Sequence, residues 1–380
     1  MTVNKAKLAD EQNRESRAKQ VAYLVSQGKS QSQIRKMLRL SSQTEVSRLL
    51  KVAKAERWIE EWHLCLADAE IAKIEKYIFE KREKLIKKLE FAAYQNEDRP
   101  PPENVLVVHT SDDEKKRLAQ FGRRAAEYVD QLLKGSHVET CAVAWGRTLK
   151  SMIDALGQRN VAPQPTLRFL PVCGEPLTGH QSGFSPTSAA MELAEVFRCK
   201  QYLSLAGVPA RIPKDFADKR KQADIIKNFV SMYRDYKKIF RSNSPMIDSV
   251  DMIVTGIGDV ATSEGDHWFK ETAELEGKEP SDLKEITAGN IGGVWLPRDP
   301  ENDIHVKAID EINRRWLGIQ EEHFVKCAKR AKTDPKKSGV VVLAHDARKA
   351  PIVERVMGMV NHLIIHEDLA EAILKLSPRR

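Results

Sequence analysis

The sequence predicts an α/β protein in two parts: an N-terminal all-α helix-turn-helix module and a doubly wound C-terminal domain with a mostly parallel sheet. Three observations favour this fold class. Residues 1–61 place their apolar side chains at helical spacing. Three consecutive prolines near residue 100 mark a stiff linker or a boundary. Beyond them, short runs of Val, Ile and Leu alternate with amphipathic segments, and such runs are typical of parallel strands buried on both faces.

The N-terminal module should begin with a helix. Residues 1–15 are polar, and we expect them to be frayed. From Arg17 onward the apolar positions fall on one helical face. Gly28 then ends this first helix, because glycine adopts the left-handed conformation of a helix C-terminus without strain.

Two further helices are expected to follow closely. Ser30 is a suitable N-cap for the second helix, and Ser41 or Ser42 for the third, since a serine hydroxyl accepts the unpaired amide hydrogens of a first turn. Only the residues "RLSS" lie between the two helices. This is the connection length of a helix-turn-helix.

The outward face of the third helix carries short polar and basic side chains: Ser42, Gln43, Thr44, Ser47, Arg48 and Lys51. Hydroxyl and amide groups pair with base edges, while Arg and Lys pair with bases or phosphates. The chain also has a formal net charge of +8, which suits a polyanionic partner. We therefore predict binding to double-stranded DNA; the alternative is a small helical bundle with a solvated polar face.

Residues 62–103 predict a long amphipathic helix followed by a proline-rich linker. Apolar residues recur at steps of three, four and seven: Ile71, Ile74, Ile78, Leu85 and Leu89. This pattern suits pairing with a second copy of the chain. It covers only about three heptads, so a single helix packed on the rest of the protein is an equal alternative.

Residues 104–380 form the predicted α/β domain. The expected strands are "NVLVVH", "VETCAVAWG", "LRFLPVCG", "YLSLAG", "VDMIVTGIG", "ITAGNIGGVWL", "GVVVLAHD" and "NHLIIH". Amphipathic segments lie between several of them, at 113–134, 147–157, 187–198 and 350–359. Alternating strands and helices of this kind predict a doubly wound sheet.

Ligands of such sheets bind beyond the carboxyl ends of the strands, and several turns there carry suitable groups. The candidates are Gly146, Arg147, Thr148, Gly174, Gly256, Gly258, Asp259 and Lys349. Amides at a helix N-terminus stabilise a phosphate, glycine admits a close backbone approach, and a lysine supplies charge. The set indicates a phosphorylated or polyhydroxylated ligand, although glycine at such turns is often only part of the loop.

Other chemistries are not indicated. The five cysteines form no CxxC pair, which suits a reducing cytoplasm and predicts neither a zinc site nor disulfides. No apolar run is long enough to cross a bilayer, so we expect a cytoplasmic protein without membrane contact. His362 and His366 stand four apart in an expected strand, where that spacing does not build a metal site. No cofactor is expected.

The order of these motifs resembles that of the SorC (SorC/DeoR-type) family of bacterial sugar-responsive transcriptional regulators. The resemblance covers most of residues 17–376 and rests on "VSRLL", "AVAWGRTL", "LPVCG", "VTGIGD", "ITAGNIGG", "VVVLAHDARKAPIV" and "NHLIIHEDLAEAIL". It implies a sensor domain similar to phosphosugar isomerases and deaminases, operator DNA and a sugar or sugar phosphate as partners, and a dimer or tetramer. It also implies that residues 146–148 bind phosphate and that Lys349 matches the lysine that the family site has near the end of the chain.

The chain departs from the family pattern at four places, one of which is the region 62–104, which is longer than usual. Glu175 stands where relatives commonly have a second glycine, and its carboxylate would either repel a phosphate or bind hydroxyls. His366 replaces a usual Asp, and residues 259–285 are expected to be an enlarged polar loop. These departures predict an unusual effector or a sensor site that no longer binds one.

We weigh three functions. A ligand-responsive DNA-binding regulator accounts for both the polar third helix and the glycine-rich strand ends. A phosphosugar isomerase or deaminase is the alternative, with Asp259, Glu175 or His345 as acid or base, but their spacing does not require it. A structural adaptor that uses the 62–95 helix explains neither feature.

Overall fold

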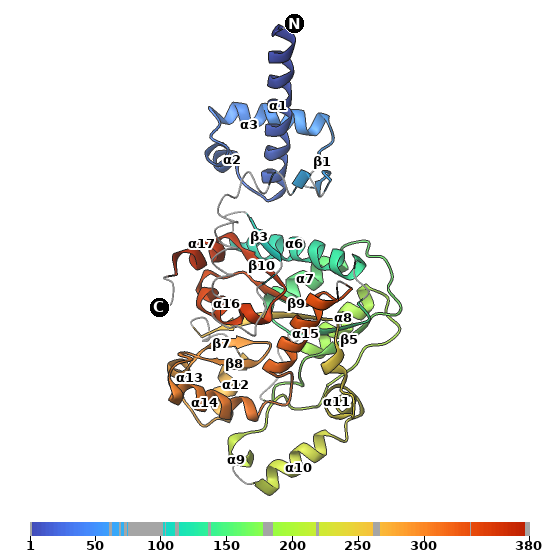
Figure 1. Cartoon of the computed structure of the whole chain (residues 1–380), viewed down its shortest axis with the longest axis vertical. Helices are drawn as coiled ribbons and strands as arrows, with labels where there is room; N and C mark the ends of the chain where they lie inside the picture. Colours follow the sequence, from blue (N-terminus) through green and yellow to red (C-terminus); the bar gives the residue numbers. More distant parts are fainter. Residues whose placement is uncertain are drawn as a thin grey trace. The chain divides into compact units, whose positions relative to one another are not determined.

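The computed structural model describes residues 2–60, 63–67, 70–71, 74, 102, 104–110, 114–135, 138–177, 185–217, 220–260, 267–334 and 336–376. The chain forms two compact units (Figure 1). Unit 1 comprises Met1–Ile86 and Val108–Gln120, and unit 2 comprises Lys87–Val107 and Phe121–Arg380. Most of the helix and linker predicted at 62–103 lies outside the described residues.

Unit 1 contains three helices and a short hairpin. The elements are α1 (Thr2–Ser26), α2 (Gln31–Met37), α3 (Gln43–Ala55), β1 (Ile59–Glu60) and β2 (His63–Leu64). The expectation of frayed residues 1–15 is wrong, since α1 begins at Thr2. Many residues of that stretch are Ala, Lys, Glu and Gln, which have high helix propensity. The antiparallel β1–β2 pair occupies the place where the sequence suggested the start of a long helix.

The predicted caps define the ends of the two short helices. The Ser30 hydroxyl accepts a hydrogen bond from the Gln33 amide at 3.3 Å, and the Gln33 side chain accepts one from the Ser30 amide at 2.7 Å. This reciprocal pair is a capping box. Ser42 caps α3 by accepting from the Glu45 amide at 3.1 Å. Gly28 adopts a φ of +76° beyond α1, as a C-terminal glycine should.

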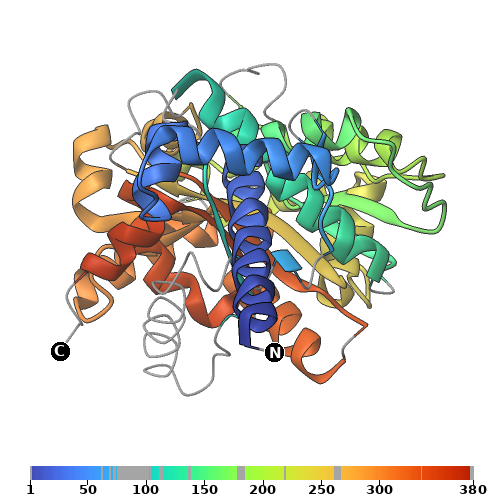
Figure 2. The ribbon, with the colours of Figure 1, turned by 90° about the horizontal axis from the view of Figure 1, so that it is seen from above.

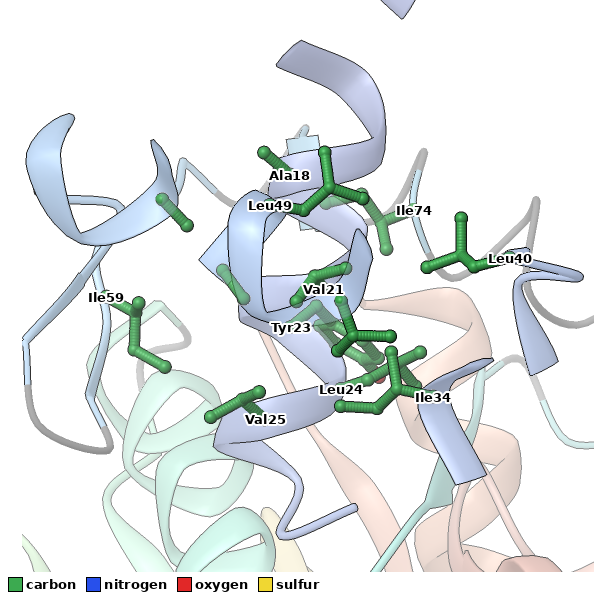
Figure 3. Close-up of a cluster of buried hydrophobic side chains, with 13 residues drawn as sticks. Ala18, Val21, Tyr23, Leu24, Val25, Ile34, Leu40, Leu49, Ile59 and Ile74 are labelled. Atoms are coloured by element: carbon green, nitrogen blue, oxygen red, sulfur yellow. The ribbon is translucent and has the colours of Figure 1, made fainter. Parts of the chain in front are cut away.

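One apolar cluster holds unit 1 together (Figure 3). Its labelled members are Ala18, Val21, Tyr23, Leu24, Val25, Ile34, Leu40, Leu49, Ile59 and Ile74, all of them buried. Apart from Ile74, they come from all three helices, from the α2–α3 turn and from β1. Burial of this cluster keeps α2 and α3 packed on α1, so the opposite face of α3 is left outside.

The sheet of unit 2 has the strand order β3-β10-β9-β6-β4-β5. The strands are β3 (Asn104–Val108), β4 (Thr140–Val143), β5 (Arg168–Pro171), β6 (Met252–Asp259), β9 (Gly339–Ala344) and β10 (His362–His366). The pairs from β10 to β5 are all parallel. The predicted doubly wound sheet is therefore confirmed, and the carboxyl ends of these strands share one edge.

Helices cover both faces of this sheet (Figure 2). One face carries α6 (Glu114–Gly135), α7 (Arg147–Gly157) and α8 (Pro186–Val196), and the other carries α15 (Glu321–Thr333) and α16 (Ala350–Val356). Right-handed crossovers account for this distribution, because the chain moves in opposite directions across the sheet after β4 and after β6. The final helix, α17 (Glu367–Lys375), follows β10.

Shorter elements complete unit 2. These are α9 (Lys214–Ala217), α10 (Arg220–Val230), α11 (Arg234–Tyr236), η1 (Lys237–Arg241), η2 (Met246–Ser249), α12 (His267–Leu275), α13 (Pro280–Ile286), β7 (Thr287–Ile291), β8 (Val294–Pro297), α14 (Asp303–Arg314), η4 (Ala347–Lys349) and η5 (Met357–Met359). The β7 strand pairs antiparallel with the end of β6 and with β8.

Three predicted elements of unit 2 differ from the structure. The strand expected at 286–296 is the β7–β8 hairpin, because Gly292 and Gly293 adopt φ values of +53° and +90° and turn the chain back. The strand expected at 202–207 is reduced to one bridge between Phe169 and Tyr202.

The third difference concerns residues 259–285, which were expected to be a polar loop. The described part of this segment forms α12 and α13. Phe269, Ala273 and Leu283 are buried there with Trp295, Ile309 and Ile312. The charged residues that suggested a loop lie between apolar positions at helical spacing, and those positions build a small core.

Candidate functional site

The outward face of α3 carries the predicted DNA-contacting side chains. Gln43, Thr44, Arg48 and Lys51 are exposed. The opposite face of the helix is buried through Val46, Leu49 and Ala53. Since positions 44, 48 and 51 follow each other at helical steps, they form one continuous polar stripe.

Ser42 and Ser47 have local partners in this structure. The Ser42 hydroxyl accepts from the Glu45 amide, and the Ser47 hydroxyl donates to Gln31 Oε1 at 3.1 Å. Ser42 therefore has a structural role as the cap of α3. Ser47 links α3 to α2, which orients the two helices relative to each other.

Glu45 also stabilises the N-terminus of α3. Its Oε2 accepts hydrogen bonds from the Ser41 hydroxyl at 2.7 Å and the Ser41 amide at 2.8 Å, and its Oε1 lies 3.5 Å from Arg17 Nη1. The hydrogen bonds from Ser41, followed by attraction to Arg17, hold the pKa of Glu45 below its usual value. The start of α3 is thus tied both to the turn and to α1.

The strand edge of unit 2 has a topological switch point between β4 and β6. From β4 the chain continues to β5 on one side, whereas from β6 it continues to β9 and β10 on the other. Side chains and amides beyond these two strands border the crevice in which ligands of doubly wound sheets bind. The predicted residues from 146 to 148 and from 256 to 259 belong to these two strand ends.

Gly146 has the conformation and surroundings expected of a ligand turn. It is the N-cap residue of α7, with φ of +125°, and a Cβ added to it would meet no atom within 4 Å. Arg147 is exposed and Thr148 is buried in the first turn of the same helix. A glycine that faces open space at a helix N-terminus leaves room for an anion near the helix amides.

Gly174 and Gly258 are closely packed against other parts of unit 2. A Cβ on Gly174 would lie 2.1 Å from the Val208 carbonyl oxygen, and one on Gly258 would lie 2.5 Å from Asn290 Nδ2. Gly256 is less confined, with the nearest contact of an added Cβ at 3.5 Å from Leu149. Close approach of neighbouring chain segments therefore accounts for the first two glycines.

Glu175 and Asp259 are buried acids at the same edge. Glu175 is 5% exposed, and its Oε1 accepts a hydrogen bond from Ser185 at 2.7 Å. Asp259 is 6% exposed and ends β6 opposite Gly289. Buried carboxylates with hydroxyl and amide neighbours are suited to binding sugar hydroxyls.

The turn after β9 contains more charge than Lys349 alone. Arg348 donates from Nε to Asp346 Oδ1 at 3.0 Å and from Nη2 to Oδ2 at 2.6 Å. This paired hydrogen bond, with attraction to Lys349 also contributing, lowers the pKa of Asp346 to about 2. The hydrogen bond with Asp346 raises the pKa of Arg348, and attraction to Asp259 makes a smaller contribution in the same direction. The sequence interpretation missed Asp346 and Arg348, although both lie in the quoted "LAHDARKAPIV" motif.

His366 is the N-cap residue of α17. It is 1% exposed, and its Nδ1 accepts a hydrogen bond from the Asp368 amide at 3.1 Å at the start of α17. The proton of a neutral His366 then lies on Nε2. The ring contacts His345 edge-on at 5.8 Å between centroids. The imidazole of His366 therefore has a structural role as the cap of α17.

An aromatic cluster beside Gly146 was not predicted. Trp145 stacks on Trp268 at 4.0 Å between centroids, and Trp316 lies 6.2 Å from both rings. Trp145 and Trp268 are half-buried. Sequence spacing carries no signal for this group, because its members come from three segments that lie far apart in the chain.

Metal and membrane chemistry find no support among the described residues. No group of three or more His, Cys, Asp or Glu side chains in that part of the chain is arranged to hold a metal ion. Burial lowers the pKa of His362 to about 4, and a hydrogen bond with the Ser338 backbone opposes this shift only in part. None of the described helices combines the length and apolar content needed to cross a bilayer. All five cysteines are free thiols.

The fold is that of an α/β domain with a mostly parallel sheet, accompanied by a helical unit. Residues 101–375 match the family model described as "Putative sugar-binding domain". The sorbitol operon regulator of Klebsiella pneumoniae is 24% identical over 273 residues, which span 71% of this chain and 75% of that protein.

Solved structures show the same fold. The full-length sorbitol operon regulator SorC of Klebsiella pneumoniae superimposes with a TM-score of 0.57 and 20% identity, over 94% of this chain and 99% of that one. A probable sor operon regulator from Shigella flexneri gives a TM-score of 0.53 and 19% identity, over 77% and 99%. The chain belongs to the SorC family of sugar-binding transcriptional regulators, and the enzymatic alternative is set aside.

Proposed function

We propose that the chain binds operator DNA through the outward face of α3, binds a sugar or sugar phosphate at the strand edge of unit 2, and changes its operator affinity when the effector binds. We place it in the cytoplasm as a homo-oligomer, a dimer or tetramer. The family relationship supports the regulator class. The residues of the two sites support the assignment of DNA binding to α3 and of effector binding to unit 2.

The observation that carries the effector part of the proposal is the environment of Gly146. It combines a positive φ, open space where a side chain would lie, and the N-terminus of α7 at the switch point of the sheet. Lys349 and Arg348 supply positive charge after β9. Buried Asp259 and Glu175 supply acceptors for hydroxyl groups, so one end of the ligand is anionic and the other polyhydroxylated.

The DNA part rests on the exposed stripe of α3. Gln43 and Thr44 supply amide and hydroxyl groups near the helix N-terminus, where a recognition helix contacts base edges. Arg48 and Lys51 continue the stripe with cations for a base or for phosphates. Capping by Ser42 and the Glu45 contacts hold this end of the helix in place.

The two activities are coupled if the effector binds one conformation of the oligomer more tightly than another. A coupling free energy of about 1–3 kcal/mol changes operator affinity by roughly 5- to 150-fold, which suffices for a switch. Because such coupling is reciprocal, operator DNA must change effector affinity by the same factor.

The test measures operator affinity with and without effector. Fluorescence anisotropy at fixed salt would follow binding of the purified chain to its own promoter region, titrated with sugar phosphates and their unphosphorylated parents. We expect specific binding that one compound shifts. Binding to promoter and unrelated DNA with equal affinity, together with no response to any compound, would reject the proposal.

A further inference from the structure

Helix α10 carries an apolar stripe that its own unit does not cover. Ile225 is 66% exposed and Phe229 is 56% exposed, and Met232 just beyond the helix is 81% exposed. Their spacing of four and three residues places them in one row. The neighbouring row is covered, since Val230 is buried and Ile226 is half-buried. The apolar face of α10 is thus wider than the surface that the chain packs against it.

The preceding helix extends this surface. Phe216 of α9 is 47% exposed, and Figure 1 shows α9 and α10 together at the end of unit 2, away from the sheet. We call the described residues between 214 and 238 the apolar arm. Exposed aromatic and aliphatic side chains in one row are characteristic of a surface that another protein covers.

The segment around the apolar arm is basic. Residues 214–241 contain nine Lys or Arg against four Asp or Glu. Lys227, Lys237 and Lys238 are exposed, and none of the three forms an ion pair within the part of the chain that the structure describes. The surface that covers the arm should therefore combine an apolar centre with carboxylates.

Unit 2 itself presents such a surface at the start of α14. Ile304 is 75% exposed, the second most exposed of the large apolar side chains in the described chain after Met232. Asp299, Glu301 and Asp303 are exposed around it. Among the described residues these carboxylates have no cationic partner. We call residues 299–304 the acidic loop.

We propose that the apolar arm of one chain docks on the acidic loop of a second copy of this chain. Ile225, Phe229 and Met232 cover Ile304, and the arm lysines pair with the carboxylates of the loop. Each chain has both surfaces, so a two-fold axis forms the contact twice and doubles the buried area. A nucleic acid would satisfy the lysines but would leave the apolar row uncovered, which is why a protein surface is the better occupant.

Mass measurement of the full-length chain by light scattering at micromolar concentration tests the contact. We expect Phe229→Asp and Ile304→Asp each to halve the mass of the assembly. The matched control is Leu177→Asp, which changes an apolar side chain that is 50% exposed outside both surfaces, and it should leave the mass unchanged. Circular dichroism and the thermal transition establish that each variant is folded.

Complementation between variants identifies the partner. Mixing the Phe229→Asp chain with the Ile304→Asp chain leaves one intact arm facing one intact loop, so the mixture should recover the larger mass that neither variant forms alone. Likewise, Lys227→Glu with Lys237→Glu should reduce the mass, and adding Glu301→Lys with Asp303→Lys should restore it.

Three outcomes overturn the proposal. The mass could be unchanged in both single variants, or the mixture could fail to recover it. The lysine variants could also retain the full mass while losing affinity for DNA of any sequence, which would assign the basic arm to a nucleic acid instead. Operator binding by the outward face of α3 is measured separately, so its failure would not affect this conclusion.

Discussion

Glu276 is a site at which a change of one functional group should lower the stability of unit 2 substantially. Its carboxylate is 1% exposed and lies between two buried arginines, Arg211 at 2% and Arg315 at 8%. Arg315 donates to it from Nε at 3.0 Å and from Nη2, and Arg211 donates from Nη1 at 3.4 Å. The Glu276→Gln variant keeps the shape of the side chain and removes the negative charge.

The expected loss follows from the position of the arginines. Burial already lowers the pKa of Arg211 to about 10, and attraction to Glu276 is the largest effect that opposes this shift. Removing one partner of a buried ion pair costs about 3–5 kcal/mol, because the other charge stays buried without compensation. For a unit of this size, about 2–4 °C per kcal/mol gives a fall in melting temperature of roughly 6–20 °C.

The assay is calorimetry of the full chain at neutral pH, which follows the thermal transition of unit 2. The matched control is Glu311→Gln, since Glu311 also faces Arg315, at 3.9 Å, but is 55% exposed. A surface pair of this kind contributes about 0–1 kcal/mol, so the control should melt within a few degrees of the parent. Equal small shifts for Glu276→Gln and Glu311→Gln would refute the argument that burial makes this pair costly.

Four further predictions address the sites and pH. Arg48→Ala should weaken operator binding by about 1–3 kcal/mol and relax preference at one base pair in anisotropy titrations; an equal loss on every sequence would show a phosphate contact instead. Lys349→Ala should leave operator affinity intact and abolish the effector response, and a full response would remove Lys349 from the site. Gly146→Ala should lower unfolding free energy by about 1–3 kcal/mol through its positive φ alone, whereas no change in chemical denaturation would contradict the strained conformation. His362 has a folded-state pKa of about 4, which is below its unfolded value. Its contribution to stability is therefore present above pH 6.5 and lost as pH falls toward 4. If the His362→Gln chain keeps the pH profile of stability of the parent, another group is responsible.

The caps and strands of this chain were predictable because their signals are local. Ser30 and Ser42 begin helices through hydrogen bonds to amides three residues away, and Gly28 ends one through its own φ. The signal for the β7–β8 hairpin is equally local, since Gly292 and Gly293 stand between two apolar runs, but the apolar residues on both sides also fit a single strand. The error at 259–285 arose because charge was given more weight than the spacing of Phe269 and Ala273.

The candidate sites depend on different kinds of information. The polar stripe of α3 follows from the helical period, so the sequence alone places Gln43, Thr44, Arg48 and Lys51 on one face. The carboxyl-edge location of Gly146 and Asp259 follows from the parallel sheet, which strand composition predicts. The roles of Gly174 and Gly258 do not follow, because both are decided by how closely Val208 and Asn290 approach them.

The sequence by itself determined the fold class, the three helices that form the N-terminal core, and the family to which the chain belongs. These properties depend on periodicity, caps and motif order, all of which are encoded within short segments. Only the tertiary structure decided which side chains meet across long separations: the Trp145, Trp268 and Trp316 cluster, the Glu276 ion pairs, and the exposed row on α10. Such contacts depend on chain topology and on the surface left uncovered after packing, and no local pattern of residues specifies either.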